Sequence, residues 1–149
     1  MTLNQKTTII KTCTWILAFV FIYTAVSKLY DWDGTQRALY NQVFPIWFAE
    51  ILLYTIPVIE LATAGLLLNS KTIRKGLLVS FILMLSFTGY IGLIMTGVFG
   101  RIPCSCGGII STLGWGEHLV LNIVLLGLAL VGIWIENAKN EEIHGIKSF

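Results

Sequence analysis

Charge is scarce in this chain. Of its 149 residues, 12% are charged, whereas a soluble globular domain carries about 25%. More than half of the residues, 56%, are hydrophobic. A chain this short and this apolar is not a soluble globule, and the composition predicts one small membrane domain over residues 1–149.

Basic clusters and processing signals are also missing. The formal net charge is only +2, and no run of Lys and Arg is long enough to hold a nucleic acid. No A-x-A-like cleavage site follows the first apolar run, so we expect that run to be a retained signal-anchor helix. Membrane lipid, and not nucleic acid, is therefore the expected surrounding of this protein.

Long apolar runs dominate what is present. Each has about 20 residues, the length with which a helix crosses about 30 Å of hydrocarbon. Backbone groups in lipid must pair internally, and the runs are too long for barrel strands, so we expect helices, with antiparallel neighbours joined by short connections. The predicted fold class is all-α, an integral membrane four-helix bundle with spans at about Ile9–Leu29, Ile46–Leu68, Leu77–Phe99 and Trp115–Ile135.

The distribution of Lys and Arg predicts the orientation of the bundle. The N-terminal segment, the second loop and the C-terminal tail carry seven of these residues, and the first and third loops carry three. Cytoplasmic segments are enriched in Lys and Arg, so both termini are expected in the cytoplasm. In the inner (plasma) membrane of a bacterium the third loop would then face the periplasm, where disulfides persist.

Cysteine is rare, with three in the chain, but two form a Cys-x-Cys pair in that third loop. Cys104 and Cys106 can close only a small disulfide ring, and strained disulfides are usually the labile, catalytic kind. Pro103 and the glycines after the pair favour a tight turn, and Arg101 is a candidate for stabilising a thiolate. A redox pair is one hypothesis, and a structural disulfide or two idle thiols is another.

A metal site is the third hypothesis for this loop. Cys104, Cys106 and His118 would form a soft ligand set for copper(I) or zinc. The chain has no Met-rich or second Cys/His cluster beside them, and a lone His at a helix start usually hydrogen-bonds locally. Cys13 lies a full membrane thickness away, so we expect it to be a buried small hydrophobe and not a resolving cysteine.

Glu60 is the clearest polar residue within a predicted span, about 21 Å along the second helix from Ile46. An intramembrane carboxylate is costly and by default indicates function. The alternative is a protonated Glu60 that hydrogen-bonds to a neighbouring helix as packing glue. Lys28 and Glu50 lie near the outer ends of their helices, where a charge pair or snorkelling explains them. Candidate functional residues outside the cysteine pair are thus Glu60, Lys28 and His118.

Three segments together resemble one family of membrane proteins. Residues 21–29, FIYTAVSKL, resemble the F-x-x-A-G-x-x-K-L end of helix one in DoxX-like proteins, and residues 57–61, PVIEL, resemble their P-x-x-E helix two. Residues 97–107 are similar to the G…P-C-x-C segment of the methylamine-utilisation MauE branch. Val26 stands where Gly is frequent, and Gly108 where Phe-Gly is common, but both cysteines are kept.

The resemblance implies an inner-membrane protein associated with periplasmic redox maturation, in the namesake branch that of methylamine dehydrogenase. It implies a periplasmic thioredoxin-like or client redox protein as partner, with this chain as a thiol-disulfide oxidoreductase accessory. Complete quinone-coupled disulfide generators carry two cysteine pairs, but this chain has one outer pair. We therefore expect a single exchange with an outside partner, and a quinone near Cys104 and Cys106 stays open as an electron acceptor. The alternatives are a non-enzymatic scaffold in a larger membrane complex and a copper- or zinc-handling protein.

Overall fold

The computed structural model describes residues 1–100 and 114–147, with side chains up to residue 142. In these residues the regular structure is helical, with α1 over Leu3–Tyr30, α2 over Trp32–Tyr40, α3 over Ile46–Leu68, α4 over Ile73–Met95 and α5 over Trp115–Lys147. α1, α3, α4 and the first 28 residues of α5 are long and apolar enough to cross a membrane. The predicted all-α bundle with four apolar spans is confirmed, and α2 is an additional short helix.

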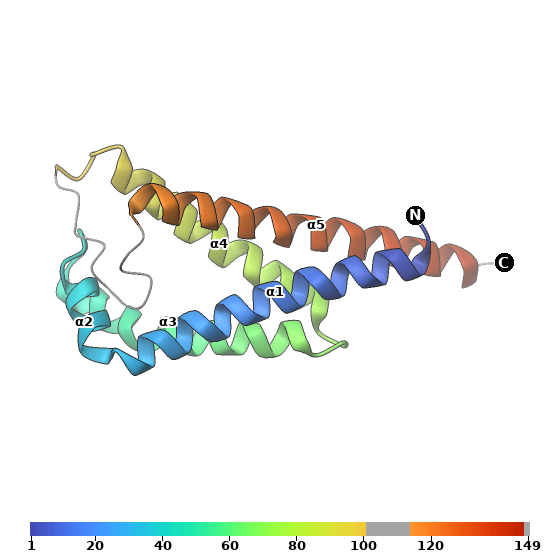
Figure 1. The fold of residues 1–149 in the computed structure, drawn as a ribbon, viewed down its shortest axis with the longest axis horizontal. Coiled ribbons are helices and arrows are strands. Elements are labelled where there is room, and N and C mark those ends of the chain that lie inside the picture. Colours follow the sequence, from blue (N-terminus) through green and yellow to red (C-terminus); the bar gives the residue numbers. More distant parts are fainter. Residues whose placement is uncertain (101–113, 148–149) are drawn as a thin grey trace.

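The four long helices pack as two pairs around a shared core. α1 packs along α3 and α5, and α4 packs along α5 and α3. Both chain termini lie at one end of the long axis and α2 lies at the other, and we call these the termini end and the α2 end (Figure 1). The α1–α3 pair and the α4–α5 pair diverge toward the α2 end (Figure 1). All four helices contribute to the buried core, which contains Leu17, Ala18, Phe21, Ala64, Leu67, Leu77, Met84, Leu125 and Ala129.

The predicted and observed helix bounds agree best for α3, which covers Ile46–Leu68. α1 begins earlier than predicted, at Leu3, because Thr2 and Gln5 form a capping box that starts the helix within its polar N-terminal segment. α5 continues past the predicted end at Ile135, since the Glu, Ala and Lys residues of the tail are good helix formers. Hydrophobicity predicts where a span lies, but capping and helix propensity decide where the helix ends.

α4 is displaced toward the N-terminus, running over Ile73–Met95 and not over the predicted Leu77–Phe99. It ends early because Gly97 adopts the left-handed conformation, with φ of +71°, that terminates many helices. The Gly97 N–H donates to the Ile94 carbonyl at 3.1 Å and closes the last turn. α4 begins before the predicted Leu77 because Arg74 and Lys75 are good helix formers. Both residues are too polar for the centre of a membrane span, so hydropathy alone places the start of the span after them.

α2 occupies a connection in which the sequence predicts no helix. The Asp31 side chain caps it by accepting a hydrogen bond from the N–H of Gly34 at 3.1 Å. A Cβ at Gly34 would crowd the Asp31 carboxylate where it stands, so a side chain there would require Asp31 to shift. The Thr35 hydroxyl donates to the carbonyl of Lys28 at 3.3 Å and so ties α2 to the end of α1. α2 therefore covers one end of the bundle in a defined position.

α3 and α4 approach each other closely near the turn that joins them. A Cβ on Gly76 would lie 2.8 Å from the backbone N of Leu67 and 2.9 Å from the backbone C of Leu66. Because no side chain fits between these backbones, glycine permits the contact that keeps the two helices together at the termini end.

Candidate functional site

Lys28 on α1 and Glu60 on α3 form an ion pair inside the bundle. The Lys28 Nζ atom lies 2.8 Å from Oε1 and 3.1 Å from Oε2 of Glu60. The Glu60 side chain is 4% exposed and that of Lys28 is 29% exposed. Nζ also donates a longer hydrogen bond, 3.4 Å, to the Thr24 carbonyl. The structure thus joins two of the candidate residues, and each supplies the counter-charge that the other needs when buried.

The direction in which helical side chains lean explains how Lys28, in the last turn of α1, reaches Glu60 in the middle of α3. Side chains on a helix lean toward its N-terminus. α1 runs toward the α2 end, so Lys28 leans back into the bundle, toward Thr24 one turn earlier. α3 runs in the opposite direction, so Glu60 leans toward the α2 end. The antiparallel packing of α1 and α3 therefore closes the distance between two residues at different depths.

Lys28 forms a charge pair, which is one of the two explanations that the sequence suggests, but its partner is Glu60 and not Glu50. Lys28 points into the bundle, and Glu50 instead accepts a hydrogen bond from the Tyr40 hydroxyl at 3.2 Å. Glu50 is exposed, whereas Glu60 is buried. A buried carboxylate is the one that needs a counter-charge, and the lean of Lys28 along α1 brings the ammonium to it.

A cavity of about 540 Å³ lies beside the ion pair, bounded mainly by α2, α3 and α4. Its volume falls within the range of small-molecule sites, about 300–1,000 Å³. Most of its wall is aliphatic or aromatic, with Leu39, Phe44, Phe48, Leu52, Ile56 and Phe87 among the lining residues. The divergence of the two helix pairs toward the α2 end leaves this space, and α2 covers it.

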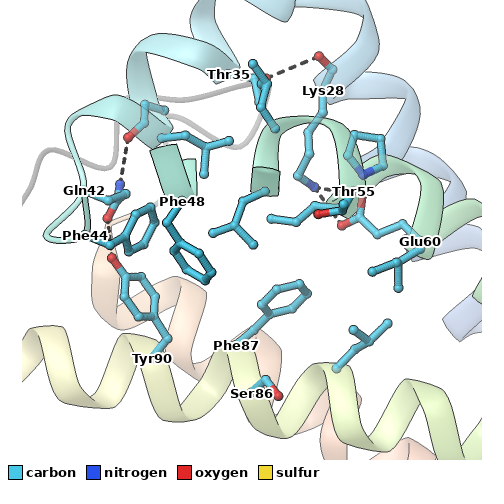
Figure 2. A pocket seen from close by; sticks show the side chains of 18 of the residues that line it. Lys28, Thr35, Gln42, Phe44, Phe48, Thr55, Glu60, Ser86, Phe87 and Tyr90 are labelled. Atoms are coloured by element: carbon cyan, nitrogen blue, oxygen red, sulfur yellow. Dashed lines mark hydrogen bonds and ion pairs between the residues drawn. The ribbon is translucent and has the colours of Figure 1, made fainter. Parts of the chain in front are cut away.

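Tyr90 and Gln42 form a second polar pair in the wall of this cavity. The Tyr90 hydroxyl of α4 donates to Oε1 of Gln42 at 2.7 Å, and the Gln42 amide group donates to the Ala38 carbonyl at 3.0 Å. Figure 2 shows this pair on the opposite side of the cavity from Lys28 and Glu60, with aromatic side chains between them. The cavity therefore has an apolar middle and hydrogen-bonding groups at two opposite edges.

A second cavity of about 460 Å³ adjoins the first, among α1, α4 and α5. Lys28, Glu60 and Tyr90 line both cavities. His118 lines the second one, together with Asn122 of α5. The structure thus gathers Lys28, Glu60 and His118, which the sequence treats as separate candidates, around one space.

The family model described as methylamine utilisation protein MauE matches residues 6–135. The chain belongs to the MauE family. The match includes every residue of the ion pair and of both cavities, and it confirms the resemblance seen in three segments of the sequence. No curated protein and no solved structure matches the chain.

The cysteine pair of this MauE-family chain, Cys104 and Cys106, and the nearby Arg101 lie outside the described residues. α4 ends and α5 begins at the α2 end, so the segment between them starts and finishes there (Figure 1). The metal hypothesis, which adds His118 to the two cysteines, depends on the same segment. Among residues 1–100 and 114–147, no group of three or more His, Cys, Asp or Glu side chains could hold a metal ion.

Cys13 is buried on α1, at 4% exposure, as the sequence predicts. Its Cβ lies 3.7 Å from the position that a Cβ on Gly132 of α5 would take. The thiol is therefore part of the packing between α1 and α5 and behaves as a small hydrophobic side chain.

Sequence reasoning missed Tyr90, Gln42 and Asn122. Tyr90 lies in an apolar span and Gln42 in a connection, so neither hydropathy nor charge singles them out. Asn122 carries a detectable signal, because it is a polar side chain within an apolar run, as Glu60 is. That signal indicates a buried polar position, but only the packing shows that it faces the cavity with His118.

Proposed function

We propose that this MauE-family membrane protein supports thiol-disulfide chemistry in the maturation of a partner redox protein, through Cys104 and Cys106. The observation that carries the proposal is that α4 ends and α5 begins at the α2 end, opposite both termini (Figure 1). The segment with the cysteines thus joins two spans on one side of the bundle. The family match includes this segment, and its methylamine-utilisation description supports a client from that system.

The proposed orientation has both termini in the cytoplasm and the cysteines on the periplasmic side of a bacterial inner membrane. Seven Lys and Arg residues in the segments at the termini end, against three elsewhere, support this orientation. The periplasm is oxidising, so a disulfide between Cys104 and Cys106 would persist there. In this proposal residues 1–149 form a single membrane domain.

The exchange passes two electrons through one cysteine pair. A client thiolate attacks the Cys104–Cys106 disulfide, which forms a mixed disulfide with one cysteine and releases the other as a thiolate. A second client thiol then attacks the client sulfur of the mixed disulfide and releases the first cysteine. The client gains a disulfide, and its two electrons and two protons stay on the thiols of Cys104 and Cys106. The disulfide of a thioredoxin-like partner then accepts them by the reverse exchange. Arg101 would favour the thiolate form, and the buried Cys13 takes no part.

Trapping of mixed disulfides in cells tests this proposal. In Cys104→Ser or Cys106→Ser, the remaining thiolate can still attack the disulfide of the thioredoxin-like partner, but the neighbouring cysteine that would complete the exchange is missing, so that partner should stay covalently attached. A non-reducing gel should show an adduct that dithiothreitol releases. Cys13→Ser is the matched control and should behave as the unmodified protein. The proposal is wrong if neither variant captures a partner and both still mature the client.

A non-enzymatic scaffold is the second candidate, and exposed glycines on the outer faces favour it. Gly65 on α3 and Gly89 on α4 are exposed, with open space where a Cβ would stand. Small residues permit close approach of a partner helix in a membrane. A scaffold predicts that the Cys104→Ser/Cys106→Ser double variant still matures the client, whereas the thiol proposal predicts that it does not.

A further inference from the structure

The charges in the cavity wall indicate a neutral ligand. Lys28 and Glu60 line both cavities and neutralise each other at 2.8 Å. A charged ligand would add an uncompensated charge to a wall that is otherwise almost wholly apolar, which is costly among membrane-spanning helices. A neutral molecule avoids that cost and can still hydrogen-bond to the pair.

The ion pair offers both a donor and an acceptor to such a ligand. Lys28 Nζ donates two hydrogen bonds to Glu60, and its third is only a long one, 3.4 Å, to the Thr24 carbonyl. A ligand carbonyl can take the place of that carbonyl as acceptor. The Glu60 carboxylate has further lone pairs that can accept from a ligand hydroxyl. The same site therefore fits a carbonyl group and the hydroxyl formed when it is reduced.

The opposite edge of the cavity offers a second set of polar groups. Tyr90 and Gln42 face the ion pair across the cavity, and Phe48 and Phe87 lie between the two polar edges (Figure 2). A flat ring with oxygen atoms at opposite ends would contact the aromatic side chains with its faces and the polar groups with its edges.

The position of the cavity indicates where the ligand comes from. Two of its main walls, α3 and α4, are long and apolar enough to cross a membrane, so we infer that a ligand reaches it from the lipid phase. The first cavity, of about 540 Å³, has room for a ring and part of an apolar tail, and the second extends the space on the other side of the ion pair.

We propose that the cavity between α2, α3 and α4 binds a neutral, lipid-soluble quinone or its quinol. The Lys28–Glu60 pair bonds one ring oxygen, the Tyr90–Gln42 pair forms the polar edge that faces the other, and Phe48 and Phe87 flank the ring. This site is built from described residues and does not depend on the thiol chemistry proposed above.

The acyl chain of a lipid matches the polar groups of this cavity less well than a quinone does. It has no group for either polar edge, and the carboxylate of a fatty acid would stand beside the Glu60 carboxylate. A quinone directs an oxygen toward each polar edge and adds no charge, so the observations favour it over lipid.

Binding can be measured on the full chain in phosphatidylcholine nanodiscs, titrated with a benzoquinone that carries a decyl tail. Quinones quench tryptophan fluorescence, and Trp115 lines the first cavity. Specific binding should appear as a saturable component above the linear quenching by quinone dissolved in lipid. Trp115→Phe should lose much of that component while the linear part remains.

Two variants fill the cavity without touching the ion pair. Ala38→Phe acts from α2 and Ser86→Leu from α4, and both positions line the cavity. Each should weaken quinone binding by about tenfold or more, a loss of the size expected when a ligand is sterically displaced. Ala62→Phe, at an exposed position on α3, is the matched control and should leave the affinity within about twofold.

Two further measurements separate specific quinone binding from the thiol chemistry and from general lipid binding. The Cys104→Ser/Cys106→Ser double variant should bind the quinone as the unmodified chain does, so a failed thiol proposal leaves this one standing. Oleate should not displace the quinone. The proposal is overturned if quenching is only linear, if folded Ala38→Phe and Ser86→Leu bind as Ala62→Phe does, or if oleate competes on equal terms.

Discussion

The Lys28 ammonium contacts both carboxylate oxygens of Glu60, at 2.8 and 3.1 Å. Of the two side chains, only that of Lys28 can turn toward solvent if the contact is broken. Its side chain is 29% exposed and stands near the end of α1, whereas that of Glu60 is 4% exposed within α3. A long, flexible ammonium can turn toward a wetter position when its partner is lost. A short buried carboxylate cannot, so the two halves of this pair differ in what their removal costs.

Lys28→Met should therefore destabilise the protein more than Glu60→Gln does. Loss of the lysine leaves a buried carboxylate without its counter-charge and should lower the free energy of unfolding by about 3 kcal/mol. Glu60→Gln keeps a hydrogen-bond acceptor and should cost about 1 kcal/mol. Unfolding in mixed micelles with increasing dodecyl sulfate measures both. Equal losses in the two variants would contradict the asymmetry.

Gly76→Ala should destabilise the contact between α3 and α4. The new Cβ would stand 2.8 Å from the backbone of Leu67, which cannot move without shifting the whole helix end. We expect a loss of about 2 kcal/mol in the free energy of unfolding, as for other overpacked sites. Gly89→Ala on the same helix is the matched control, because nothing lies within 4 Å of its Cβ. A stable Gly76→Ala would show that the helices are not held this closely.

The hydrogen bond from Tyr90 to Gln42, at 2.7 Å, ties α4 to the connection between α2 and α3. Tyr90→Phe and Gln42→Leu should show a coupling energy of about 1 kcal/mol in a double-mutant cycle, the usual net value of one hydrogen bond. Hydrogen exchange in residues 41–45 should also become faster in Tyr90→Phe, because that connection loses a contact to α4. Additive effects and unchanged exchange would argue against this link.

Cys13 should resist alkylation in the folded protein. In the Cys104→Ser/Cys106→Ser background it is the remaining thiol, and its side chain is packed between α1 and α5. Its reaction with a maleimide should be slower by about tenfold or more than that of Thr8→Cys, at an exposed position on α1, in the same background. The difference should vanish in dodecyl sulfate. Rapid labelling without detergent would show that Cys13 is accessible.

Much of the fold follows from the sequence because lipid imposes a simple rule. An apolar run of the right length must be a helix, so the bounds of α3 are predicted from hydropathy alone. The start of α1 and the end of α4 depend on local chemistry, the Thr2–Gln5 capping box and the left-handed Gly97. α2 depends on the Asp31 cap and on packing against α3, which hydropathy does not detect.

The candidate site is predictable only in part. Glu60 is identified by its charge within an apolar run, and the family resemblance contains Lys28 as well as Glu60. Their contact was not predicted, because distance along each helix suggests Glu50 as the nearer partner. The lean of side chains on antiparallel helices brings Lys28 to Glu60 instead. Tyr90 and Gln42 carry no signal of their own, and the packing of α4 against the α2 end makes them part of the wall.

The sequence by itself determined that this is an all-helical membrane protein of the MauE family, since composition and short motifs do not depend on how helices pack. It also determined which few polar residues lie within apolar spans. Only the tertiary structure decided which of them meet, because a contact depends on the relative depth and rotation of two helices. The tertiary structure likewise decides that the two helix pairs diverge toward the α2 end and that the Lys28–Glu60 pair lies in the wall of the cavity there.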